Sequence, residues 1–117
     1  MPPECRAGEL GSGMGGKSYT LNLTIEADNP LYAGCEIEEA PNGYRLKQYP
    51  AEIANVVGHN AEAIVRRLVA DGVERITLTG RSAIWAYLVV FHNVVHRFRE
   101  VYYDDGKPNG AVRIAAH

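Results

Sequence analysis

The strongest chemical signal in the sequence is the run Thr79-Gly80-Arg81-Ser82, where a short apolar strand gives way to a helix. A glycine turn that enters a helix at Ser82 leaves backbone N–H groups free at the positive end of the helix dipole. Arg81 adds a guanidinium at the same place. We expect an anion or phosphate site here; a plain strand-to-helix connection capped by Ser82 is the alternative.

Two histidines, His92 and His96, follow on the helix that this turn introduces. At about 100° per residue, side chains four positions apart share one edge of a helix, where they can converge on a metal or a substrate. The sequence lacks the glutamate of an HExxH zinc protease, and a structural or surface role is the alternative for both rings. The same spacing assigns the core-facing side of the helix to four apolar residues, Ile84, Leu88, Phe91 and Val95.

A third candidate group, Asp104, Asp105 and Lys107, follows the next apolar strand. Turn chemistry alone explains an Asp-Gly pair. If the strand lies beside the helix that carries the histidines, a carboxylate and imidazoles together would suit a divalent metal such as manganese, which accepts oxygen and nitrogen ligands. The position of the strand decides between these interpretations.

Residues 11–18 read Gly-Ser-Gly-Met-Gly-Gly-Lys-Ser and match the phosphate-loop pattern G-x-x-x-x-G-K-[ST] letter for letter. That loop binds phosphate only between a buried strand and a helix, because the helix N-terminus supplies part of the cradle. Here polar residues precede the pattern and a strand-like alternation follows from Ser18. We therefore expect residues 1–17 to form a flexible glycine-rich leader and not a nucleotide site.

The elements that must position these groups follow from local periodicity. Tyr19, Leu21, Leu23 and Ile25 alternate with polar residues, which predicts a half-buried strand from Ser18 to Glu26. The remaining predicted elements are a hairpin of 35–39 and 44–49 around Pro41-Asn42-Gly43, a helix capped by Asn60 and running to Ala70, a strand over 75–79, a helix from about 82 to 97, and strands over 99–104 and 110–116. Interleaved strands and helices indicate an α/β or α+β domain of residues 18–117, with about two helices covering a mixed sheet.

Length and charge narrow the function classes. A chain of 117 residues can bury the core of one domain but has no room for two. Residues 1–40 carry two Lys/Arg and seven Asp/Glu, and residues 41–117 carry ten Lys/Arg and seven Asp/Glu. This charge balance argues against a surface that binds a nucleic-acid duplex, but it permits the binding of a compact anionic ligand. Two cysteines are too few for a disulfide framework, no apolar run approaches a membrane span, and no signal peptide is visible, so the sequence predicts a cytoplasmic protein without a membrane partner.

The motifs of the C-terminal half, taken together, resemble one family. They are Gly80-Arg81-x-x-Ile84-Trp85, then His92-x-x-x-His96, then Val101-Tyr102-Tyr103-Asp104, and Gly110-Ala111-Val112. Their order is similar to that of the small CRISPR-associated ring nucleases of type III systems, the Csx-three family. The resemblance is clearest over residues 76–117, extends in character to the strand at 19–26, and does not cover the leader; the stretch 51–71 looks longer than in compact members.

The resemblance implies a compact ferredoxin-like α+β fold that assembles as a homodimer or homotetramer. It implies that the protein binds cyclic oligoadenylate, chiefly cyclic tetra-adenylate, and cleaves it to linear products, which switches off the antiviral signal. It also implies an alternative activity, a manganese-dependent exonuclease that removes adenylate from the ends of single-stranded RNA. Two further alternatives are a sponge that binds the cyclic nucleotide without turnover and a structural oligomerisation domain packed through Trp85.

By motif match, Gly80, Arg81 and Ser82 would contact the ring phosphates, His92 or His96 would be the catalytic histidine, and Asp104 the catalytic aspartate. His96 and Asp104 would be the metal ligands. Where the family often reads Tyr-Asp-Pro-Arg, this chain reads Tyr103-Asp104-Asp105-Gly106-Lys107, so Lys107 would supply the ligand-binding charge. A shift of one residue would move the role of the aspartate to Tyr103 or Asp105.

The chemistry expected of such a site is transesterification. A ribose 2′-OH attacks its neighbouring phosphorus in line and expels the 5′-oxygen, leaving a 2′,3′-cyclic phosphate. A histidine moves a proton or orients a metal held by Asp104, while Arg81 and the helix N-terminus stabilise charge on the phosphoryl oxygens. One small domain cannot enclose a four-membered ring alone, so binding and catalytic groups are expected from different copies.

Overall fold

The computed structural model describes residues 16–108 and 110–117 of the chain. Its elements occur in the order β1 (Lys17–Asn22), the short 3-10 turn η2 (Pro30–Tyr32), β2 (Ile37–Ala40), β3 (Gly43–Leu46), α2 (Pro50–Ala70), β4 (Val73–Thr79), α3 (Ile84–Val94), β5 (Glu100–Asp104) and β6 (Val112–Ala116). The predicted α+β class, with a mixed sheet and two helices, is confirmed.

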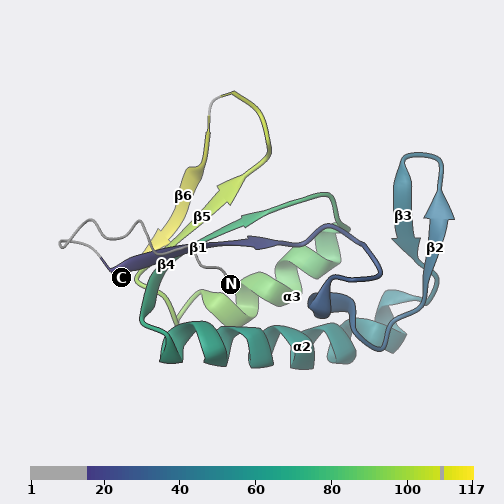
Figure 1. Ribbon diagram of the computed structural model, residues 1–117, viewed down its shortest axis with the longest axis horizontal. Helices are drawn as coiled ribbons and strands as arrows, with labels where there is room; N and C mark the ends of the chain where they lie inside the picture. The colour runs from purple at the N-terminus through teal and green to yellow at the C-terminus, as the bar shows by residue number, and fades with distance from the viewer. Residues whose placement is uncertain (1–15, 109) are drawn as a thin grey trace.

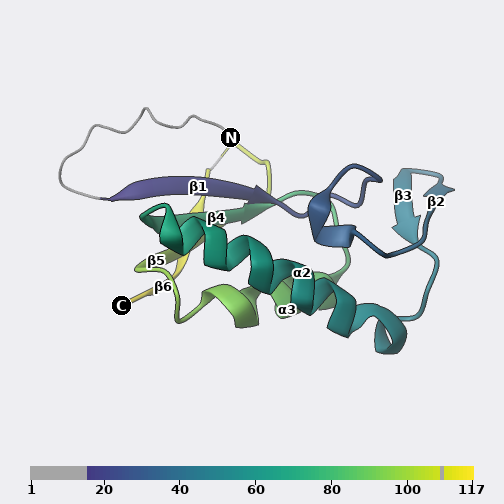
Figure 2. The same cartoon turned by 60° about the horizontal axis from the view of Figure 1, so that its bottom comes forward.

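The main sheet has four strands in the order β1-β4-β5-β6. Strands β1, β4 and β5 run parallel, and β6 pairs antiparallel with β5. Helices α2 and α3 form the crossovers between the parallel strands, and two crossovers of the usual hand that step in the same direction place both helices on one face. Figures 1 and 2 show this two-layer arrangement, which is consistent with a ferredoxin-like α+β fold, and the β2–β3 hairpin standing beside it.

The alternation predicted around β1 is confirmed. Leu21, Leu23 and Ile25 are buried in the core, whereas Ser18 and Thr20 on the other side are exposed. The chain keeps to the edge of β4 beyond the end of β1, because the Leu23 N–H donates to the Thr79 carbonyl over 2.7 Å. This continuation brings residues 22–25 against the start of the loop that follows β4.

Helix α2 begins at Pro50, ten residues before the predicted cap at Asn60. Proline is well suited to the first turn of a helix, and the Glu52 side chain accepts a hydrogen bond from the Tyr49 N–H over 3.1 Å. Asn60 lies inside the helix, where its side-chain amide donates to the carbonyl oxygens of Leu31 and Ala33, both over 2.9 Å. The prediction was wrong here because Asn60 looks like a cap locally but fastens the η2 turn to the helix.

Helix α3 spans Ile84–Val94, which is shorter at both ends than the predicted 82–97. The predicted core stripe is wrong in its first half, since Ile84 is 80% exposed and Leu88 is 64% exposed, whereas Phe91 does pack against the core. The buried positions are Ala86, Val90 and Val94. Because the helix is apolar on nearly every side, periodicity could not identify the face that packs, and the smaller side chains allow the closest approach to the sheet and α2.

The predicted hairpin is confirmed, with Ala40 paired to Gly43 and a turn of Pro41 and Asn42 between them. The last predicted strand begins two residues late, at Val112. In the described ranges, no helix has both the length and the apolar character needed to cross a bilayer.

The predicted leader lies outside the described residues up to residue 15. Lys17 already belongs to β1, where its Nζ donates to the Asp71 carbonyl over 2.8 Å. A strand therefore follows the phosphate-loop pattern, as predicted, in place of the helix that such a loop requires.

Candidate functional site

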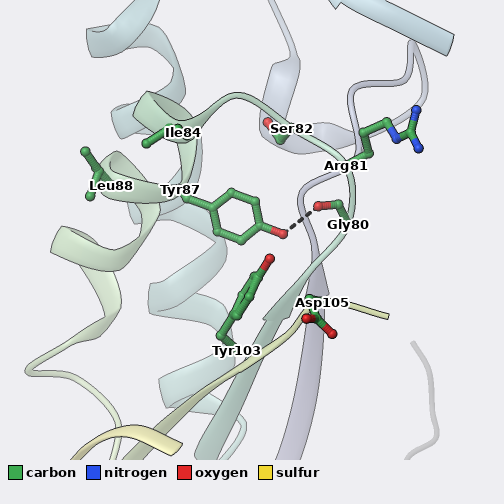
Figure 3. Close-up of a pocket in the computed structure, with 8 residues that line it drawn as sticks. All are labelled: Gly80, Arg81, Ser82, Ile84, Tyr87, Leu88, Tyr103 and Asp105. Carbon is green, nitrogen blue, oxygen red and sulfur yellow. Dashed lines mark hydrogen bonds between the residues drawn. The ribbon is translucent and has the colours of Figure 1, made fainter. Parts of the chain in front are cut away.

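The candidate site is a hollow of about 560 Å³ at the carboxyl ends of β4 and β5, beside the N-terminus of α3 (Figure 3). Open α/β sheets commonly bind ligands at this edge, where the loops that follow the strands meet. The hollow is lined by Gly80, Arg81, Ser82, Ile84, Tyr87, Leu88, Tyr103 and Asp105. The structure thus brings three of the predicted ligand-binding residues, Gly80, Arg81 and Ser82, to one place.

Gly80 makes the turn out of β4 in a backbone conformation that other residues rarely adopt, with φ at +107°. A Cβ at this position would stand 2.3 Å from Oδ1 of Asn22 and 2.7 Å from the main-chain nitrogen of Thr24. The glycine therefore serves both the turn and the close approach of the residues that follow β1.

The helix does not start at Ser82, as predicted, but two residues later, with Ala83 as an N-cap that offers no side-chain hydrogen bond. The Ser82 hydroxyl is instead 2.7 Å from the hydroxyl of Tyr32, which also donates to the Leu23 carbonyl. In the described part of the chain, no protein group accepts a hydrogen bond from the N–H of Ile84 or Trp85. The positive end of α3 is thus open to an acceptor.

Arg81 lies at the rim of the hollow with an exposed side chain that points away from its centre (Figure 3). Its main-chain N–H donates to Oγ1 of Thr24 over 3.2 Å, and its Nη1 donates to the carbonyl oxygen of Asn42 over 3.0 Å. Among the residues placed by the structure, no carboxylate forms an ion pair with Arg81. Its positive charge is therefore uncompensated by a direct partner, as an anion site requires.

Tyr87 is the site residue that the sequence did not single out. Its hydroxyl donates to the carbonyl oxygen of Gly80 over 2.5 Å, which ties α3 to the glycine turn (Figure 3). Burial, with the neighbouring Tyr103 and Tyr32 hydroxyls, raises the pKa of Tyr87 to about 12, so the phenol stays a hydrogen-bond donor at neutral pH. Helical side chains tilt toward the N-terminus, and this rule applied one turn into α3 could have pointed to Tyr87.

Tyr103 forms the other wall of the hollow. Its ring meets that of Tyr87 edge to face, with centroids 5.5 Å apart and planes at 83°. Tyr103 is 38% exposed, and its hydroxyl points into the hollow beside that of Tyr87 (Figure 3). An aromatic surface next to an anion site is what a nucleotide needs, since a base can stack while its phosphate is bound.

The three candidate residues at the end of β5 and in the turn that follows it divide between the hollow and its surroundings. Asp105 lines the hollow, whereas Asp104 points to the opposite side of the strand from Tyr103. The carboxylate of Asp104 accepts a hydrogen bond from the Gly106 N–H over 2.8 Å, which is turn chemistry. Lys107 is exposed in the same turn and does not line the hollow.

His92 and His96 are both exposed, and neither lines the hollow; His92 lies one turn of α3 beyond Leu88, which does, and His96 follows the end of the helix. Helix α3 starts at the carboxyl end of β4 and returns to the start of β5, so its last turn is at the opposite end of the sheet from Gly80. There the His96 ring lies 5.5 Å from that of His117, centroid to centroid. The structure does not bring the predicted catalytic histidines to Asp104 or Arg81 within one copy.

The predicted manganese ligands, His96 and Asp104, are separated in the same way. Across residues 16–108 and 110–117, no three histidine, cysteine or carboxylate side chains gather closely enough to hold a metal ion. His96 and Asp104 do not come together as ligands within one copy, and manganese binding stays a prediction.

The local arrangement of the site combines an open helix N-terminus, an arginine without a carboxylate partner and a pair of tyrosines. This combination can hold a phosphate and stack a base. Protein-family models, curated proteins and solved structures were all compared with the chain, and none of them matches it.

Proposed function

We propose that the hollow binds one adenylate unit of a cyclic oligoadenylate, cyclic tetra-adenylate above all, and that the assembled protein cleaves the ring to a linear product. The observation that carries the proposal is Arg81: its guanidinium has no carboxylate partner and lies at the rim of a hollow that two tyrosines wall and that borders the start of α3. Arginine and helix N-termini are strong phosphate-binding groups. In a cell, such an enzyme removes the cytoplasmic second messenger of a type III CRISPR antiviral response.

The hollow is large enough for one nucleotide of the ligand but not for the whole ring. Its volume of about 560 Å³ is within the range of small-ligand pockets and suits one nucleotide. A cyclic tetra-adenylate has four such units, so several copies of the chain must surround it. The proposal therefore includes assembly as a homodimer or homotetramer.

The proposed reaction needs no group beyond the ligand and the protein. The 2′-oxygen of one ribose attacks the adjacent phosphorus, the bond from phosphorus to the 5′-oxygen breaks, and the proton of the 2′-OH is transferred to the departing 5′-oxygen. The products are a 2′,3′-cyclic phosphate and a free 5′-OH on one linear chain. Arg81 and the N–H groups of Ile84 and Trp85 would stabilise charge on the non-bridging oxygens, while the closed ring keeps nucleophile and phosphorus close together.

The histidines require a composite site in this proposal. Because neither His92 nor His96 lines the hollow and His96 packs beside His117, the proposal takes the catalytic histidine from another copy. One of them would take the proton of the 2′-OH, and an imidazolium would return it to the leaving 5′-oxygen.

The direct test incubates the protein with labelled cyclic tetra-adenylate, with and without manganese, and separates the products. We expect a linear product with a 2′,3′-cyclic phosphate end, a large loss of activity in Arg81→Ala and no loss in Arg45→Ala. Arg45 is a matched control because its guanidinium already pairs with Glu38 on an exposed strand. Unchanged ligand at stoichiometric protein would refute the enzymatic proposal.

A mixing experiment tests the composite site. Arg81→Ala copies and copies that carry both His92→Ala and His96→Ala are each expected to be inactive. Mixed together, they form some sites with an intact arginine and an intact histidine, so part of the activity should return. No recovery after verified exchange of subunits would contradict the sharing of sites between copies.

A second candidate is a sponge that binds the cyclic nucleotide without turnover. The absence of both histidines from the lining of the hollow favours it, because one copy then has binding groups without an imidazole among them. Tight binding of cyclic tetra-adenylate, unaffected by the histidine substitutions and without product, would select this candidate. Efficient shortening of linear adenylate RNA would instead select the exonuclease alternative.

A further inference from the structure

The turn of the β2–β3 hairpin contacts the arginine of the candidate site, although it is 39 residues away in sequence. The carbonyl oxygen of Asn42 accepts a hydrogen bond from Nη1 of Arg81 over 3.0 Å. Asn42 belongs to the two-residue turn between β2 and β3, so the tip of the hairpin lies against the guanidinium. The proposed reaction does not use this contact.

The contact leaves the phosphate-binding edge of the guanidinium free. A guanidinium presents five N–H groups in a fixed plane, and the edge formed by Nε and Nη2 matches two oxygens of a phosphate. Asn42 takes a hydrogen of Nη1, and in the described residues neither Nε nor Nη2 of Arg81 has a protein acceptor. The hairpin thus holds Nη1 of the guanidinium, while Nε and Nη2 stay free to donate hydrogen bonds to a phosphate.

The hairpin is built to keep its turn in place. At its base, Ile37 and Leu46 pack against the main core. At its tip, Pro41 presets the first turn position, and Gly43 adopts a φ of +133° that other residues rarely reach. A two-stranded hairpin alone is barely stable in water, so attachment at both ends is significant.

We propose that the Asn42 carbonyl is a positioning group that orients the Arg81 guanidinium for the phosphate before the ligand arrives. This inference rests on the proposed function, since it takes Arg81 to bind phosphate. Ordering a flexible side chain during binding costs roughly 0.5–1.5 kcal/mol, and a side chain that is already ordered avoids that cost. Loss of the turn contact is therefore expected to weaken binding by about two- to tenfold.

The first experiment needs no ligand and measures hydrogen exchange of the β2–β3 ladder amides. Arg81→Ala should speed exchange in the hairpin and leave β4 and β5 unchanged, while Arg81→Lys, which keeps a donor, should restore part of the protection. Arg45→Ala, which removes an exposed pair on the same hairpin, controls for a general loss of charge. Equal exchange in the wild type and Arg81→Ala would overturn the inference.

The second experiment measures the affinity for cyclic tetra-adenylate in a double-mutant cycle of Gly43→Val and Arg81→Ala. A Cβ at Gly43 meets no atom within 4 Å, but valine cannot hold the native φ, so the substitution shifts the turn without a clash of the Cβ. We expect Gly43→Val to weaken binding two- to tenfold when Arg81 is present and to have no effect when it is absent. An equal effect in both backgrounds would overturn the inference, because the hairpin would then act independently of Arg81.

The two experiments separate the inference from the proposed function. If the wild type does not bind cyclic tetra-adenylate, the proposed function fails, and the exchange measurement still decides whether the turn and Arg81 are coupled. If the ligand binds and exchange is unaffected by Arg81→Ala, the proposed function stands and the positioning role fails.

Discussion

The turn at Gly80 allows a sharp test of how the site is built, by the substitution Gly80→Ala. The native φ of +107° costs an L-residue about 1–2 kcal/mol. The added Cβ would also stand 2.3 Å from Oδ1 of Asn22, which now accepts hydrogen bonds from the N–H and the hydroxyl of Thr24 over 2.9 and 2.6 Å. Displacing that side chain costs about 1–2 kcal/mol more.

Gly72→Ala is the matched control, because Gly72 also has a positive φ, +87°, but no atom lies within 4 Å of the Cβ position. It should lose only the conformational part, about 1–2 kcal/mol, against about 2–4 kcal/mol for Gly80→Ala. For a domain of this size, Tm falls by about 4 °C per kcal/mol, so the two variants should differ clearly in thermal and urea unfolding. Equal losses in the two variants would refute the close approach of the loop to the residues after β1.

Three further predictions concern single side chains. Asn60→Ala leaves two carbonyls of the η2 segment without their donor and should cost about 1–3 kcal/mol in urea unfolding; a loss below about 0.5 kcal/mol would contradict the role of the amide. Tyr87 should ionise near its raised pKa of about 12, so its contribution to stability is complete below pH 10 and lost as the pH rises toward 12. The pKa values of Tyr32 and Tyr102 are also raised, so tyrosinate absorbance should show several late-titrating phenols, one of which Tyr87→Phe removes; an unchanged late amplitude would contradict the burial of Tyr87. The hydrogen bond from Tyr102, aided by the charge of Arg75, lowers the pKa of Glu100. The stabilisation from this carboxylate is therefore present above about pH 4.5 and lost as the pH falls through the lowered pKa. Tyr102→Phe should raise the pKa of Glu100 in an NMR titration, and an unchanged pKa would count against the hydrogen bond.

The sequence predicted the elements whose patterns are unambiguous. The alternation after Ser18 and the Pro41-Asn42-Gly43 turn each admit one interpretation, and both are confirmed. The passage from β4 through Gly80 into a helix was also predicted and is confirmed, whereas anion binding at Arg81 stays a prediction.

Two features could not be predicted because they depend on packing between distant segments. Helix α3 is apolar on nearly all sides, so the choice of Ala86 over Ile84 as the buried side rests on how closely α2 and the sheet approach it. Asn60 has the local signature of a helix start, and only the position of η2 reveals its role inside α2.

The sequence predicted the part of the candidate site that consecutive residues form, but not which distant residues lie near that part. Gly80, Arg81 and Ser82 are consecutive, so the sequence could place them together. The sequence analysis expected His96 to lie near Asp104, but this depends on the direction of α3. The helix runs away from the end of β5, where Asp104 lies, so the two residues are apart. Tyr87 escaped notice because a single tyrosine in an apolar helix carries no motif.

The central claim is that Arg81 and the start of α3 bind a phosphate of cyclic tetra-adenylate, and calorimetric titration of that ligand into the full-length protein tests it most directly. We predict saturable binding by the wild type, at least tenfold weaker binding by Arg81→Ala, as expected for a charge-assisted contact of about 1.5–3 kcal/mol, and unchanged binding by Arg45→Ala. Absence of binding to the wild type, or equal affinity of the wild type and Arg81→Ala, would contradict the claim.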